Sequence, residues 1–149
     1  MLKRNITVII FSLVLAGCGY MPVTNQNYIN INNVSFENNI PNSLKIKFKE
    51  LIDDGSSNLM VTIEKYQIKE RKIYGGPSLR ALESELKGEL TVIIYDDQSK
   101  LRKKFISIKN FSVSELNPLA EKETVSSLED VIQKDLINQL TLEVRLIEM

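Results

Sequence analysis

Hydrophobic residues along the chain change their spacing from one segment to the next, and this spacing predicts the secondary structure. Between Leu59 and Ile63 they alternate with polar residues, which is typical of a strand with one buried face. The alternation changes phase before Tyr66, which indicates a β-bulge or a strong twist. Residues 86–97 predict a second strand with Gly88 in its middle and one apolar face made of Leu86, Leu90, Val92 and Ile94.

A third strand follows directly after a turn. The sequence Asp96-Asp97-Gln98-Ser99 is typical of a tight hairpin turn, so residues 100–113 are predicted to pair with the strand before it. This third strand is the most basic, and Phe105 and Ile106 are predicted to point to opposite faces. The Gly75-Gly76-Pro77 sequence separates the first strand from the second.

Two other segments have helical spacing. After Pro41, with Asn42 or Ser43 as the cap, one helical face collects Leu44, Phe48, Leu51 and Ile52. Near the C-terminus a longer apolar stripe contains Leu128, Val131, Ile132, Leu136, Leu140, Val144 and Ile147. Two start signals precede this stripe: Asn117-Pro118, and the capping-box spacing of Ser126 with Glu129.

The order of these elements predicts the fold class. A possible short strand at residues 28–31 is followed by a helix, three strands and the long helix. Hairpin-linked strands are antiparallel, and both helices have one apolar face to bury. We therefore predict an α+β two-layer sandwich, in which about four mostly antiparallel strands carry two helices on one face.

The N-terminus has the features of a secretory signal. Lys3 and Arg4 precede an apolar core at residues 6–16, which is about half of the roughly 20 residues that span a membrane. The sequence Leu15-Ala16-Gly17-Cys18 resembles a bacterial lipobox. That resemblance implies a diacylglycerol on the Cys18 sulfur, cleavage before Cys18, and acylation of the new amino terminus. Several acyl chains on one residue are sufficient for stable membrane attachment.

This signal divides the chain into three predicted parts. Residues 1–17 form the lipoprotein signal peptide, residues 18–27 form an Asn-containing tether, and residues 28–149 form a single domain. Residue 19 is Gly and not Asp, which in lipoproteins of this kind favours the outer membrane over the inner one. Loss of Lys3 and Arg4 leaves two more acidic than basic residues, so net charge does not favour a nucleic-acid partner.

The composition argues against an enzyme. The chain contains no His and one Cys, so neither a Ser-His nor a Cys-His pair can form, and zinc would need carboxylates alone. Ser84 and Lys87 match the Ser-x-x-Lys pattern of penicillin-recognising enzymes, but on a strand they face opposite sides. We therefore expect no catalysis, no cofactor and no metal.

Basic residues gather at two predicted strand ends. One group is Lys69, Arg71 and Lys72, followed by Arg80, and the other is Lys100, Arg102, Lys103 and Lys104. In a hairpin sheet the two groups are expected to approach each other. Clustered cations can bind phosphate or carboxylate groups, but lysines on exposed strands also prevent strands of different molecules from pairing. The sequence leaves both interpretations open.

Several short motifs together resemble the LPS-assembly lipoprotein (LptE-like) family. They are Cys18-Gly19-Tyr20, Asn117-Pro118, Leu119-Ala120 and Gln139-Leu140, in the same order of strands and helices. The resemblance implies a plug and assembly partner inside an LptD-like outer-membrane β-barrel that delivers lipopolysaccharide to the outer leaflet. It also implies lipopolysaccharide contacts at Arg80, before the third strand of the family fold, and at Lys122.

We expect the lipid to touch the exposed face of the sheet, since the apolar helix stripe is needed for the core. One departure from the family pattern concerns the Leu119-Ala120 motif, which Glu121 follows directly, with Lys122 next. The alternative function is that of a periplasmic accessory lipoprotein of another lipid-trafficking transporter. Recovery of inner-membrane or periplasmic transport proteins in a detergent pull-down would distinguish it from a barrel partner.

Overall fold

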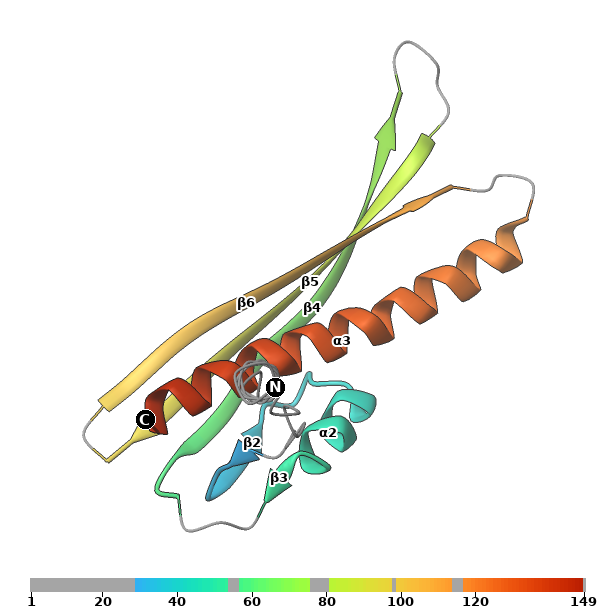
Figure 1. Cartoon of the computed structure of the whole chain (residues 1–149). Coiled ribbons are helices and arrows are strands. Elements are labelled where there is room, and N and C mark those ends of the chain that lie inside the picture. The colour runs from blue at the N-terminus through green and yellow to red at the C-terminus, as the bar shows by residue number, and fades with distance from the viewer. Residues whose placement is uncertain (1–28, 54–56, 76–80, 98, 114–116, 149) are drawn as a thin grey trace, which may run out of the picture.

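The chain folds as one four-stranded sheet covered by two helices (Figure 1). The computed structural model describes residues 29–53, 57–75, 81–97, 99–113 and 117–148. Their elements in chain order are β1 (Ile29–Asn30), β2 (Asn33–Phe36), α2 (Asn42–Lys49), β3 (Ile52–Asp53), β4 (Met60–Tyr74), β5 (Ala81–Asp96), β6 (Ser99–Ser112) and α3 (Pro118–Glu148).

The strand order of the main sheet is β2-β4-β5-β6. The hairpin partners β4, β5 and β6 are antiparallel, as the turn sequences predict, whereas β2 pairs with β4 in parallel. The short strands β1 and β3 form a separate parallel pair beside the main sheet. The predicted α+β fold with a mostly antiparallel four-stranded sheet is confirmed.

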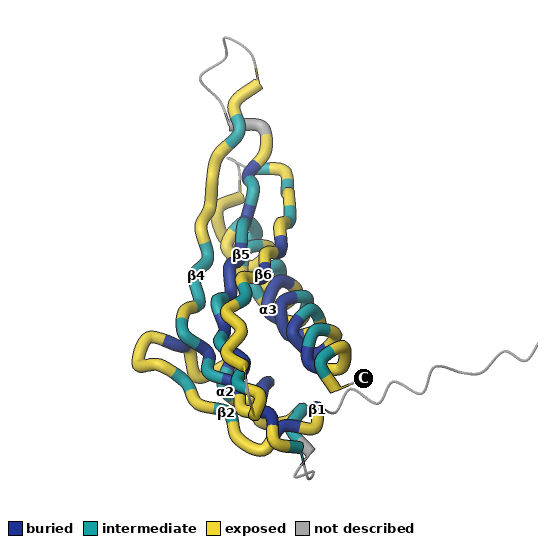
Figure 2. Tube along the Cα trace, turned by 90° about the vertical axis from the view of Figure 1, so that its left-hand side faces the viewer, coloured by how far each residue is buried: buried dark blue, intermediate teal, exposed yellow. Residues whose placement is uncertain are grey.

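Both helices lie on one face of this sheet. In Figures 1 and 2, α3 runs along the sheet across β5 and β6, and α2 lies beside it. Lys47 of α2 donates hydrogen bonds from Nζ to Asp130 (2.8 Å) and Gln133 (2.7 Å) of α3, which fixes the helices as neighbours. The core between the layers contains Leu44, Phe48, Val61, Ile63, Leu86, Leu90, Val92, Ile94, Phe105, Ile132, Leu136, Leu140 and Val144.

The predicted strand faces are confirmed. The predicted apolar face of β5 is buried at Leu86, Leu90, Val92 and Ile94, and Phe105 is buried while the neighbouring Ile106 is 41% exposed. The register of β4 against β5 shifts between Ile63 and Lys65, which is the bulge that the change of phase predicts. Gly88 is the point where α3 comes closest to the sheet, because a Cβ placed there would lie 2.2 Å from Ile132 Cγ2.

One of the two start signals of α3 is right and the other is wrong. The helix begins at Pro118, and Asn117 Oδ1 accepts a hydrogen bond from the Ala120 backbone N–H (3.1 Å). Ser126 lies more than two turns inside the helix, so the capping-box prediction is wrong. Val131 is 38% exposed and departs from the predicted buried stripe.

Two details of α2 also differ from the prediction. Its N-cap is Pro41 without a side-chain hydrogen bond, so neither Asn42 nor Ser43 caps the helix. Ile52 was expected on the apolar helical face, but it belongs to β3 and pairs with Ile29. The predicted short strand at residues 28–31 corresponds to β1, and Tyr28 lies outside the described residues.

Candidate functional site on the open face of the sheet

The helices leave the opposite face of the sheet uncovered in the part of the chain that the structure describes (Figures 1 and 2). The strand register places alternate residues of β4, β5 and β6 on this open face, including Gln67, Glu85, Lys87, Glu89 and Ile108. Most of these side chains are polar or charged. Apolar exceptions include Met60 of β4, which is 45% exposed, and Ile106 and Ile108 of β6, with exposures of 41% and 49%. The face therefore combines ionic groups with an exposed apolar strip on β6.

Glu89 is the centre of the charge arrangement on the open face. Its carboxylate accepts Lys87 Nζ at 2.8 Å and Lys104 Nζ at 2.9 Å, and also a hydrogen bond from Gln67 Nε2. Lys87, then Lys104 and Gln67, lower the pKa of Glu89 to about 2 by hydrogen bonding to its charged form. One carboxylate thus holds a residue from each of the three long strands together.

Two arginines of the face are also paired with carboxylates, but one lysine is not. Arg102 reaches Glu64 with two hydrogen bonds, from Nε at 2.8 Å and from Nη2 at 3.0 Å. Arg71 Nη2 lies 3.3 Å from Glu85 Oε2. Among the described residues, Lys69 has neither an ion pair nor a hydrogen bond. An anionic ligand would therefore meet both neutralised and unneutralised cations here.

A shallow hollow of about 440 Å³ lies on this face. Its lining residues are Lys69, Arg71, Glu85, Lys87 and Ile108. Three cations, one carboxylate and one apolar side chain can together contact a molecule that carries a phosphate or carboxylate next to an alkyl group. The arrangement is suited to binding such a molecule.

Lys122 lies on the other side of the sheet from this face. It is an exposed residue near the start of α3, and it lines a hollow of about 350 Å³ with Glu70, Pro118, Glu121 and Val125. In the described part of the chain Lys122 has no ion pair or hydrogen bond. The two other predicted site residues, Cys18 and Arg80, lie outside the described residues.

The two basic groups do not approach each other, so that prediction is wrong. The register places residues 69–72 beside Ser84–Lys87 of β5, whereas residues 100–104 lie beside Thr91–Tyr95. The hairpins join β4 to β5 and β5 to β6, so the end of β4 and the start of β6 lie at opposite ends of β5. Lys103 moreover faces the helix layer, where its Nζ lies 2.6 Å from Glu143 of α3.

The Ser84–Lys87 pair has the geometry that its place on a strand predicts. Ser84 is buried on the helix side, where its hydroxyl donates to Glu70 Oε1 at 2.9 Å. Lys87 is on the open face with Glu89. The Ser-x-x-Lys match therefore carries no nucleophile–base pair.

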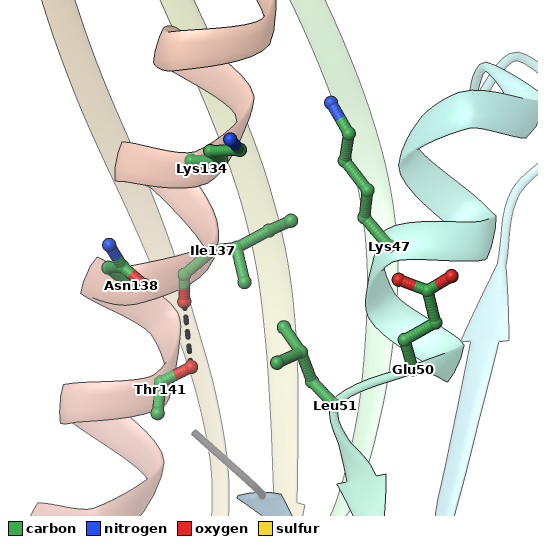
Figure 3. A pocket seen from close by; sticks show the side chains of 7 residues that line it. All are labelled: Lys47, Glu50, Leu51, Lys134, Ile137, Asn138 and Thr141. Atoms are coloured by element: carbon green, nitrogen blue, oxygen red, sulfur yellow. Dashed lines mark hydrogen bonds between the residues drawn. The ribbon is translucent and has the colours of Figure 1, made fainter. Parts of the chain in front are cut away.

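A groove between the two helices was not predicted from the sequence (Figure 3). It has a volume of about 430 Å³ and is lined by Lys47, Glu50, Leu51, Lys134, Ile137, Asn138 and Thr141. Figure 3 shows Leu51, in the turn that follows α2, and Ile137 of α3 on the two sides of the groove. The groove depends on how α2 packs beside α3, which apolar spacing does not determine.

The described residues contain neither a metal-type cluster nor a membrane-spanning helix. No three acidic, His or Cys side chains among them are close enough to share a metal ion. None of the helices in the same residues is long and apolar enough to cross a membrane.

These features define a class: small α+β sandwiches in which one long helix crosses an antiparallel sheet. Three solved structures share this fold with the chain. They are a minor lipoprotein from Acinetobacter baumannii (TM-score 0.60, 15% identity), rare lipoprotein B from Shewanella oneidensis (0.62, 10%) and an uncharacterized lipoprotein B from Nitrosomonas europaea (0.61, 14%).

The likeness covers 78%, 78% and 83% of this chain, and 90%, 96% and 88% of the three lipoproteins, in the same order. At such low identity it shows the fold alone. No family model matches the sequence. No curated protein matches it either.

Proposed function

We propose that the protein is an outer-membrane lipoprotein that acts as plug and assembly partner of an LptD-like, lipopolysaccharide-translocating β-barrel. The observation that carries the proposal is the fold, which three lipoproteins share over most of their length. Rare lipoprotein B is the LptE protein, so this likeness supports the family that the sequence motifs resemble. Attachment through acylated Cys18 places the domain on the periplasmic side of the outer membrane.

The surface of the domain is consistent with a binding role and not a catalytic one. Its open face presents paired charges and an exposed apolar strip, and Lys122 is a cation without a carboxylate partner in the described part of the chain. Lipopolysaccharide carries phosphates beside acyl chains, so both kinds of contact are available. The domain needs no enzyme chemistry to occupy a barrel and guide such a lipid.

The partner is tested by crosslinking in intact envelopes. A photoreactive residue at exposed Lys65 on the open face is expected to capture one large outer-membrane barrel, and gentle detergent is expected to copurify the same barrel. Recovery of the protein without any barrel would refute the proposal. Recovery with inner-membrane or periplasmic transport proteins would support the alternative, an accessory lipoprotein of another transporter. Cys18→Ser should release the domain from the membrane fraction in the same cells.

The lipid contacts are tested by charge reversal. Lys122→Glu and Arg80→Glu are expected to weaken lipopolysaccharide binding about tenfold or more, since one charge-assisted hydrogen bond contributes about 1.5–3 kcal/mol. The melting temperature should stay nearly unchanged for Lys122→Glu, because this exposed side chain has no partner to lose within the described residues.

Lys49→Glu is the matched control for this test. Lys49 is an exposed lysine at the end of α2, and its reversal changes the net charge by the same amount. Binding is measured by titration of purified protein with lipopolysaccharide at fixed ionic strength. Equal binding by Lys122→Glu and Lys49→Glu would remove Lys122 from the contact surface.

A further inference from the structure

The chain enters the described domain beside the groove between α2 and α3. Ile29 is the first described residue, and its backbone N–H donates to the Leu51 carbonyl at 2.7 Å. Leu51 lines the groove, and β1 also lies near α3 on its other side. The residues that immediately precede Ile29 therefore start next to the wall of this groove.

The register of β1 gives the direction from which the chain arrives. β1 pairs with β3 in parallel, with Ile29 beside Ile52. A chain that continued upstream in the same direction would pass Leu51 and then Glu50, and both of these residues line the groove. The direction of β1 thus points the preceding residues toward the groove.

Regular strand pairing stops at Ile29. In a parallel pair the next bond upstream would come from the Leu51 N–H, but this group already donates to the Phe48 carbonyl at 3.1 Å. Any binding of the preceding residues therefore has to come from side chains.

The lining of the groove suits an uncharged polar peptide. Ile137 is 3% exposed and, with half-buried Leu51, forms the apolar part of the lining. Glu50 and Asn138 are exposed, and in the described part of the chain their side chains have neither a hydrogen bond nor an ion pair. An occupant that brings amide groups and an apolar ring could contact both parts of the lining.

The segment before Ile29 has this chemistry. Residues 25–28 read Asn-Gln-Asn-Tyr, and residues 19–28 contain no charged side chain. An Asn or Gln amide both donates and accepts, so it can bond to a carboxylate or to another amide. Continued in the register of β1, Tyr28 would lie beside Leu51, on the face of the chain opposite the buried Ile29 side chain. Its ring could therefore cover the apolar part of the lining.

The length of the groove matches a few residues of extended chain. The lining extends along α3 from Lys134 to Thr141, which is about 10 Å. An extended chain covers this distance in about three residues. Residues 25–28 are therefore sufficient to fill the groove.

We propose that residues 25–28 bind in the groove between α2 and α3, with amide side chains bonded to Glu50 and Asn138 and the Tyr28 ring against Leu51. Covalent connection favours this occupant over a free molecule, because a segment joined to the domain by a short linker has an effective concentration in the millimolar range. The docking needs no second molecule, so it is compatible with a barrel around the domain.

Docking would shorten the free part of the tether. Residues 18–27 reach about 35 Å when fully extended, whereas residues 18–24 reach about 25 Å. With an acylated Cys18, which is part of the proposed function, the domain would be kept this close to the membrane surface. The tether would then leave the domain from the helix layer.

Disulfide formation across the groove tests the docking. In the Cys18→Ser chain, Gln26→Cys is combined with Asn138→Cys, and the control combines it with Leu142→Cys. Leu142 is 60% exposed on the same helix and does not line the groove. Under mild oxidation the Asn138→Cys pair is expected to form its disulfide about ten times faster or more, because docking raises the effective concentration there. Equal rates at the two positions would overturn the proposal.

A second measurement shows which molecule fills the groove. The Asn138→Cys thiol is alkylated in two proteins, one with the natural tether and one with Gly-Ser-Gly-Ser in place of residues 25–28. The replacement is expected to speed this alkylation about fivefold or more, since a covered thiol reacts slowly, and to leave the Leu142→Cys rate unchanged. An unchanged Asn138→Cys rate would overturn the proposal. If that unchanged rate were also far below the Leu142→Cys rate, another molecule would occupy the groove.

Both experiments use purified protein without a barrel, so they are separate from the test of the proposed function. Failure to recover a barrel from intact envelopes would contradict the proposed function and leave the docked tether standing. Equal disulfide rates would overturn the docked tether and leave the barrel partner standing.

Discussion

Replacement of Gly88 by alanine tests how closely α3 packs on the sheet. Gly88 lies in the middle of β5 and is buried beneath the helix. A Cβ there would lie 2.2 Å from Ile132 Cγ2 and 3.3 Å from Leu136 Cδ1, and both of these side chains are fully buried. The first distance is more than an ångström short of ordinary contact, so the helix or the strand must move.

The net cost follows from two opposing effects. Overpacking of a filled core typically costs about 1–3 kcal/mol. Alanine restricts the unfolded chain more than glycine does, which returns about 0.4–1 kcal/mol. We therefore expect Gly88→Ala to lower the free energy of unfolding by about 1–2 kcal/mol. In a domain of this size, the melting temperature should fall by about 3–8 °C.

A double-mutant cycle identifies the contact responsible. Ile132→Ala removes Cγ2 and by itself should cost about 2–5 kcal/mol, because it leaves a cavity. In that background the new methyl group of Gly88→Ala meets Ile132 Cβ at an ordinary 3.6 Å and fills part of the cavity. The second substitution should then be neutral or stabilising, which corresponds to a coupling of at least about 1 kcal/mol.

Urea denaturation followed by far-ultraviolet circular dichroism measures all four proteins of the cycle in the Cys18→Ser background. Two results would refute the reasoning. One is a Gly88→Ala protein as stable as its parent. The other is an equal cost of the substitution with and without Ile132, which would mean that the strain does not arise at the helix contact.

Two further predictions concern the ion cluster and the start of α3. Glu89 has a pKa of about 2 in the folded protein, below its ordinary value of 4.5, so its contribution to stability is present above about pH 5 and is lost as the pH falls toward 2. The stability difference between wild type and Glu89→Gln, from urea curves at several pH values, should therefore shrink on acidification, and a constant difference would contradict the assigned cluster. Asn117→Ala should cost about 1 kcal/mol through loss of the cap, whereas Ser126→Ala in the helix interior should be neutral or slightly stabilising. Thermal melts of both variants decide which signal starts the helix, and the reverse ranking would place its start at Ser126.

The sequence predicts the sheet better than the arrangement of its charges. Alternation with period two determines which side of a strand is buried, so the faces of β5 and β6 could be read directly, and the turn residues show that the strands are antiparallel. The position of one basic group relative to another depends on the register over many residues. A hairpin also puts the end of β4 far from the start of β6, which makes the expected cluster impossible.

The sequence offers two possible starts for α3, and only one of them is used. Asn117-Pro118 and Ser126-Glu129 are both acceptable local signals, and a polar stretch between them leaves the sequence undecided. The helix takes the earlier start, where Glu121 also lies in its first turn near the positive end of the helix dipole. No sequence pattern predicts the groove between α2 and α3. Lys47 contacts Asp130 and Gln133 only because both helices pack side by side on the sheet.

The distribution of neutralised charge bears on where an anionic lipid would bind. Lys87 and Lys104 could contact a phosphate only by weakening their ion pairs with Glu89, in which the Nζ–Oε distances are 2.8 and 2.9 Å. Lys69 and Lys122 have no such bond to give up among the described residues. Lys69 lies on the open face, and Lys122 shares a hollow with Glu70, the next residue of β4, on the helix side. Phosphate contacts should therefore form around this part of β4 more readily than at Arg102, Lys103 and Lys104 of β6, which are all paired with carboxylates, since unpaired cations bind an anion at lower cost than paired ones.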